Sequence, residues 1–147
     1  MAAFHGKIGK ITWDASTAST TEIDAITSWT LDITCDVADG SDMSAATKTY
    51  FAGWKDWTAT VESILPTTGS QIPLVDAAGV EALGEKTPAI LEMWLDDTGG
   101  AGNVVVIHGA AICVGIGYNI DVNDVVKITY NFQGTGALTH ATSEPTY

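Results

Sequence analysis

The sequence predicts a mainly β fold, an antiparallel sandwich or barrel with one short flanking helix. Apolar and polar residues alternate with a period of two in several segments, which is typical of strands buried on one face. Turn-forming stretches separate these segments, as in sandwiches and barrels. The 147 residues match the length of a single domain, and five Trp, four Tyr and three Phe supply material for its core.

The first strands are expected in the N-terminal third. Residues 4–14 alternate loosely, and residues 22–36 alternate cleanly, so the second segment predicts an antiparallel strand with one buried face. That face is expected to carry Trp29, Leu31, Ile33 and Cys35. Residues 37–48 form a polar, Asp-rich loop, and loops of this length in compact domains are usually functional or intermolecular.

The middle of the chain continues the β pattern. Residues 50–54 precede a strand at residues 56–65, in which the apolar Trp57 and Val61 alternate with polar residues. Residues 66–73 are rich in turn formers. The helix is expected at residues 76–83, because Asp76 is a suitable N-cap and Gly84 a suitable C-terminal stop.

The C-terminal part begins with a predicted strand at residues 89–97 and a Gly-rich hairpin loop at residues 98–103. Residues 104–120 are uncharged and mostly apolar, which raises the alternative of a short membrane helix. The many Val, Ile and Gly residues instead favour one long strand, or two strands with a kink at Gly115 or Gly117. A strand at residues 125–133 and a polar tail at residues 139–147 complete the chain.

The charge of the chain excludes several classes of partner. Six Lys and no Arg stand against 18 acidic residues, which gives a formal net charge of −12. Proteins that grasp nucleic-acid phosphates or anionic membranes need clustered cations, so neither mode of binding is expected. Two cysteines, Cys35 and Cys113, are too few for a disulfide scaffold and are expected as free thiols.

Side chains that carry chemistry are sparse. His5, His108 and His140 do not stand at metal-ligand spacing. The acidic cluster at residues 36–42 does not match a calcium loop, because aligning Gly40 to the loop glycine puts apolar residues or Cys where carboxylates are needed. The Gly-x-Gly pairs lack the third glycine of a dinucleotide-binding loop. We therefore expect no catalytic residue, metal or cofactor, and no enzyme activity.

Three segments, taken in this order and spacing, resemble the major tail tube proteins of long-tailed bacteriophages. They are residues 26–39, residues 48–62 with Gly-Trp-Lys-Asp-Trp-Thr, and residues 129–138 with Phe-Gln-Gly-Thr-Gly-Ala-Leu. The resemblance covers about residues 4–140.

The resemblance implies a structural virion protein of one domain, residues 1–147, that is assembled in the bacterial host cytoplasm. Six copies would form a ring, each adding strands to a continuous inner β-barrel, and rings would stack into a tube. The implied partners are a tape-measure protein, tail terminator and baseplate proteins, and genome DNA as passing cargo, with no membrane binding. By position, residues 37–48 are the candidate inter-ring loop. Its candidate contact residues are Asp36, Asp39, Asp42, Met43 and Lys48.

DNA must pass such a tube without sticking, and a wall with few cations offers no phosphate-pairing sites. Polar strand faces are therefore the candidates for the lumen. The candidate residues are Glu22, Asp24, Ser28, Thr30, Thr129, Asn131 and Gln133. Lys127 would be an awkward lumen residue, so its placement tests the hypothesis.

Other interpretations stay open. The polar faces suit an ordinary monomeric sandwich in solvent equally well. A capsid decoration protein is a second viral alternative. A carbohydrate-binding sandwich is a third, and it would place Trp13, Trp54 or Trp94 on an exposed platform.

Overall fold

The computed structural model describes residues 9–14, 21–23, 26–44, 46–65, 89–97 and 104–142. Within these ranges the chain forms eight strands of one sheet, all paired antiparallel, so the prediction of a mainly antiparallel β fold is confirmed. The helix expected at residues 76–83 lies outside the described ranges. No helix in the described part of the chain is long and apolar enough to span a membrane.

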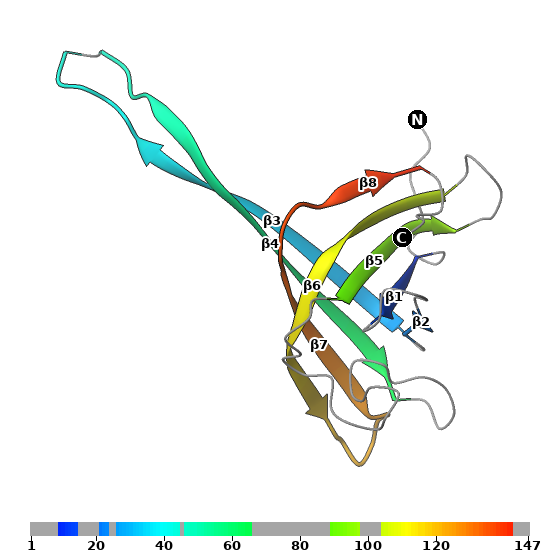
Figure 1. Ribbon diagram of the computed structural model, residues 1–147. Coiled ribbons are helices and arrows are strands. Elements are labelled where there is room, and N and C mark those ends of the chain that lie inside the picture. The colour runs from blue at the N-terminus through cyan, green and yellow to red at the C-terminus, as the bar shows by residue number, and fades with distance from the viewer. Residues whose placement is uncertain are drawn as a thin grey trace, which may run out of the picture.

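The sheet has the strand order β2-β1-β5-β6-β7-β4-β3, and β8 pairs with β6 (Figure 1). The strands are β1 (Lys10–Asp14), β2 (Thr21–Glu22), β3 (Ile26–Asp39), β4 (Tyr50–Ile64), β5 (Ala89–Asp97), β6 (Val104–Asn119), β7 (Lys127–Gly134) and β8 (Thr139–Ala141).

The predicted alternation sets which face of each central strand is buried. In β4, Trp57 and Val61 are buried whereas Thr58 and Glu62 are exposed, and β7 repeats this pattern with Tyr130 buried. Side chains of successive strand residues point to opposite faces. One face of β3, β4 and β7 is therefore apolar and the other polar.

The core forms because the sheet folds over on itself. Trp13 of β1 and Phe132 of β7 are separated by β5 and β6 in the strand order, yet their ring centroids lie 4.8 Å apart. The two rings are tilted by 45°, an arrangement that aromatic pairs favour. Both side chains belong to one buried cluster that joins both ends of the sheet.

Residues 104–120 form the long strand that the sequence predicts. β6 runs unbroken from Val104 to Asn119, with a register irregularity between Cys113 and Gly115, where a kink is expected. Its first half pairs with β5 and its second half with β7. The membrane-helix interpretation of this segment is therefore wrong.

The β3–β4 hairpin extends past the body of the sheet as an arm, which we define as residues 33–56 (Figure 1). The predicted loop at residues 37–48 is too long, because β3 continues to Asp39 and β4 begins at Tyr50. A register shift between Cys35 and Val37 interrupts the alternation here, which hides the strands from a period-two search.

One further expectation needs correction. Ile33 is 61% exposed and Cys35 is also exposed, because the core ends near Trp57 and the arm continues beyond it. Within the polar tail, Thr139–Ala141 forms β8 against β6. Cys35 and Cys113 are both free thiols, as predicted.

Candidate functional site

A polar face covers three adjacent strands, β3, β4 and β7. It borders β6, whose residues on the same side are Ile112, Gly115, Gly117 and Asn119. Register places Thr30 beside Thr60, and Thr60 beside Asn131, so side chains of this face form rows across the sheet. Five of the seven predicted lumen residues lie on it. The polar face consists of Ser28, Thr30, Asp32, Asp56, Thr58, Thr60, Glu62, Lys127, Thr129, Asn131 and Gln133.

Hydrogen bonds between neighbouring strands fix these side chains. The Ser28 hydroxyl donates to Glu62 Oε2 at 3.1 Å. The Gln133 amide Nε2 donates to Asp56 Oδ1 at 2.8 Å and lies 3.3 Å from the Trp57 carbonyl oxygen. Side chains of the polar face are therefore held in place by hydrogen bonds to neighbouring strands.

The charge of the polar face is acidic. Asp32, Asp56 and Glu62 supply three carboxylates, and within the described residues Lys127 is the one cation of this face. The Lys127 ammonium lies 3.1 Å from Asp124 Oδ2 at the β6–β7 turn. A hydrogen bond from the Val125 backbone N–H, with Lys127, lowers the pKa of Asp124. Lys127, which was expected to be awkward in a lumen, therefore does lie on the polar face, where it forms an exposed ion pair with Asp124.

The remaining two lumen candidates are not placed on these strands. Glu22 lies in β2, which pairs with β1 at the other end of the strand order. Asp24 lies outside the described residues. The sequence list omitted Asp32, Thr58, Thr60 and Glu62, although the same alternation could have identified them.

The series of four strands β3, β4, β7 and β6 ends in two open edges. Within the described chain, β3 pairs with β4 on one side and with no strand on its other side. Among the described residues, β6 pairs with β5 as far as Ala111, which lies opposite Ala89 at the start of β5, and Ile112–Asn119 pairs with β7 alone. Open edges present unpaired N–H and C=O groups and are ready templates for another chain.

The tip of the arm is ordered by local hydrogen bonds. The Gly40 N–H donates to the Thr49 carbonyl at 2.8 Å and closes the hairpin. The Asp39 carboxylate accepts from the Ser41 N–H at 2.9 Å, and Ser41 hydrogen bonding lowers the pKa of Asp39. Asp42 accepts similarly from the Ser44 N–H.

The predicted inter-ring residues all lie on the arm, with Asp36 in β3 and Asp42, Met43 and Lys48 at the tip. The arm also carries six large, exposed apolar side chains, of which only Met43 was predicted as an inter-ring residue. They are Ile33, Val37, Met43, Tyr50, Phe51 and Trp54. No described residue of the body covers these side chains. Exposed apolar side chains gathered in one place are typical of a surface that contacts another molecule.

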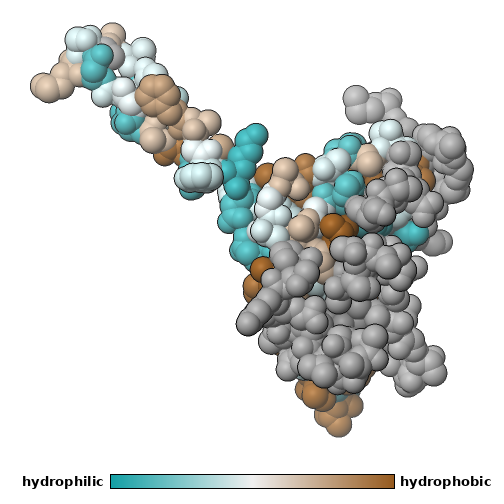
Figure 2. All heavy atoms as spheres, viewed as in Figure 1, coloured by the Kyte–Doolittle hydropathy of each residue, from teal (hydrophilic) through white to brown (hydrophobic). Residues whose placement is uncertain are grey.

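A second exposed apolar group lies at the opposite end of the molecule, around the β6–β7 turn, where Ile120 is 75% and Val122 is 96% exposed. Figure 2 shows the arm and this turn projecting on opposite sides of the body. Two unlike apolar ends suit head-to-tail contacts between copies.

The described residues contain no candidate metal cluster, and two of the three candidate sugar-platform tryptophans are buried. No group of three or more His, Cys, Asp or Glu side chains in the described part of the chain is arranged to hold a metal ion. Trp13 and Trp94 are 3% and 4% exposed, so they cannot form a sugar platform, and Trp54 alone of the three is exposed.

Solved structures with a similar fold are known. The chain matches the tail of an empty gene transfer agent particle, solved with C6 symmetry, with a TM-score of 0.73 and 14% identity over 95% of this chain and 99% of that one. The fold of the present chain is that of tail and tube proteins. The SPP1 tail tube has a TM-score of 0.72 and 14% identity, over 97% of this chain and 80% of that one.

The tail-tube fold extends to contractile systems. The sheath–tube complex of an extracellular contractile injection system has a TM-score of 0.69 and 11% identity, over 95% of this chain and 92% of that one. No protein-family model matches the sequence, and no curated protein matches it. At these identities, the comparisons establish the fold alone.

Proposed function

We propose that this chain is a structural tail tube protein, and that its polar face lines the bore of a ring-stacked tube. The observation that carries the proposal is the combination of an ordered polar face with two open edges in the series of strands β3, β4, β7 and β6. A monomer has no need of two such edges, whereas ring closure pairs them and removes both.

Strand direction supports ring closure. Each neighbouring pair in the series β3-β4-β7-β6 is antiparallel, so β6 and β3 run in opposite directions. When β6 of one copy lies beside β3 of the next, the antiparallel pattern continues across the junction. The same contact repeated around an axis gives a closed ring of heterologous contacts.

A ring of six copies is consistent with the resemblance and with the six-fold tail structure. Six copies of four strands, spaced by about 4.8 Å, give a barrel circumference of about 115 Å and a backbone diameter of about 37 Å before strand tilt widens it. Such a bore admits a DNA duplex while keeping the polar face close to it.

The arm supplies the stacking contact in this proposal. Its residues 37–48 extend away from the body with exposed apolar side chains, and Asp36, Asp39, Asp42, Met43 and Lys48 are the candidate contacts with the neighbouring ring. Burying apolar side chains such as Met43 between rings would stabilise the stack.

The acidic polar face suits a conduit. Carboxylates repel phosphates, and the local pairing of Lys127 with Asp124 leaves few cations to hold DNA. The tube would form around a tape-measure protein in the host cytoplasm, end on terminator and baseplate proteins, and serve in the virion tail. DNA would be its cargo and not a ligand.

Negative-stain microscopy of the purified protein tests the proposal. Hollow tubes or six-fold rings are the expected result. Discrete trimers at all concentrations would favour a capsid decoration protein, and a monomer whose Trp54 fluorescence responds to glycans would favour a carbohydrate-binding module.

A further inference from the structure

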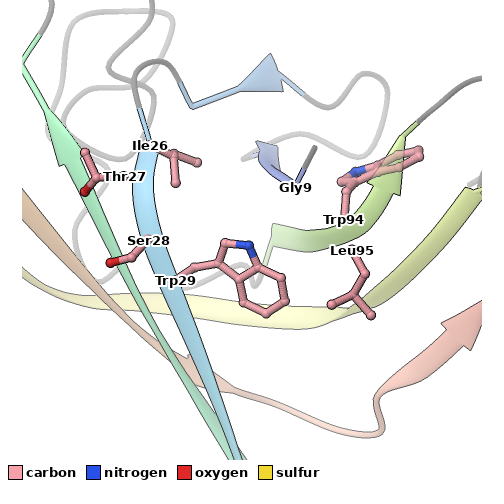
Figure 3. A pocket seen from close by; sticks show the side chains of 7 residues that line it. All are labelled: Gly9, Ile26, Thr27, Ser28, Trp29, Trp94 and Leu95. Atoms are coloured by element: carbon pink, nitrogen blue, oxygen red, sulfur yellow. The ribbon is translucent and has the colours of Figure 1, made fainter. Parts of the chain in front are cut away.

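An apolar pocket of about 480 Å³ borders the open edge of β3. Figure 3 shows Ile26 and Trp29 from β3 on one side of it and Trp94 and Leu95 from β5 on the other. Ile26 and Trp29 are registered with Ser63 and Val61, which are buried, so these two side chains stand on the core side of the sheet. Thr27 and Ser28 also line the pocket, but Figure 3 shows their side chains pointing away from Trp94 and Leu95.

The opposite open edge, on β6, carries exposed apolar side chains. Val114 is 57% and Tyr118 is 55% exposed. Tyr118 is registered with Ile128, which is fully buried, so its ring stands on the core side of the sheet, like the pocket. The exposed Tyr118 ring at the β6 edge therefore lies on the same side of the sheet as the apolar pocket at the β3 edge.

We propose that the pocket beside β3 receives Tyr118 from the β6 edge of a second copy. This inference rests on the proposed ring and names its lateral contact. When the two edges pair antiparallel with their polar faces in register, Tyr118 is brought to the core side of the neighbouring β3, where the pocket opens. A tyrosine ring offers a large rigid contact area with few rotatable bonds.

Charge favours these two edges as the junction. The chain carries a net charge of −12, so most surfaces of two copies repel one another. Residues 26–31 of β3 and residues 112–119 of β6 carry no formal charge. Pairing them brings two copies together without placing carboxylates directly opposite each other.

Mixed cross-linking tests the contact. In a Cys35→Ser background, one sample carries Thr27→Cys beside the pocket and the other carries Asn119→Cys, next to Tyr118, so that the Tyr118 ring is retained. Mixing under assembling conditions with mild oxidation should give a disulfide between the two chains. Thr139→Cys, on exposed β8, is the matched control and should give at least tenfold less product. Equal cross-linking of the control overturns the proposal.

Substitution gives a second, independent measurement. Tyr118→Asp should abolish ring formation by mass photometry, and Tyr118→Phe should retain it. Thr139→Asp controls for added charge, and circular dichroism should show the same fold in all three. If wild type and Tyr118→Asp assemble equally, the proposed pocket contact is wrong, whereas the proposal of a tube still stands. If wild type itself stays monomeric, both the tube and this contact are overturned.

Discussion

The indole nitrogen of Trp57 donates a hydrogen bond to the carbonyl of Gly136 at 3.2 Å, across 79 positions of sequence. The same indole lies over Gly134, where an added Cβ would come within 2.0 Å of Trp57 Cε2. Gly136 has a φ of +84°, which favours glycine and turns the chain from β7 towards β8. This packing brings the Gly-Trp-Lys-Asp-Trp-Thr and Phe-Gln-Gly-Thr-Gly-Ala-Leu motifs into direct contact.

Gly134→Ala should destabilise the chain, because the methyl group has no room beneath a buried indole. Overpacking of this kind costs about 1–3 kcal/mol of unfolding free energy. Gly117→Ala is the matched control, since no atom lies within 4 Å of its added Cβ. Urea unfolding of both variants measures the difference, and equal midpoints would show that Trp57 does not require Gly134.

The sequence predicts the parts of the fold in which alternation is uninterrupted. The strands around Trp29, Val61 and Tyr130 each keep a period of two, and their polar sides together form the polar face. The strands β3 and β4 also continue into the arm, but the register shift between Cys35 and Val37 interrupts the period of two there. The hairpin therefore looks like a long loop in the sequence.

Other features depend on tertiary packing that no local pattern encodes. Trp13, Trp54 and Trp94 were equal candidates for an exposed platform, yet two are buried and one is exposed, because only Trp54 lies on the arm. In the described residues, the open edge of β6 begins after Ala111, the residue opposite the start of β5, and the uniform apolar run does not reveal this position. Strand β8 is too short and polar to predict.

Shortening the arm should uncouple ring formation from stacking. Gly40 and Thr49 are joined by a hydrogen bond, so residues 41–48 can be replaced by an Asn-Gly turn with the hairpin retained. The variant is expected to form single rings that no longer elongate, as counted by negative-stain microscopy. Tubes of normal length would show that the arm tip makes no essential inter-ring contact.

Adding cations to the polar face should make the tube retain DNA. Thr30→Arg adds one cation per copy at an exposed position of β3, and Thr139→Arg adds the same charge on β8. Assembled Thr30→Arg tubes should bind DNA in co-sedimentation at low salt and release it as salt rises. If only the β8 variant retains DNA, the polar face does not line the bore.

The chain should lose stability at alkaline pH through Tyr130. Burial raises the pKa of this phenol to about 12. An unfolded tyrosine titrates near about pH 10, so the unfolded chain loses its proton first, and stability that is complete below about pH 10 falls as the pH rises through about 12. Urea midpoints between about pH 8 and 11.5 should decline less for Tyr130→Phe. Identical declines would assign the effect to other groups.

The account depends most on which surface faces the bore. A cryo-electron map of the assembled protein tests this directly. We expect a six-fold tube in which Thr30, Thr60 and Asn131 line the bore and β6 of one copy pairs with β3 of the next. A map in which the polar face lies on the outside, or in which these edges do not meet, would contradict the account.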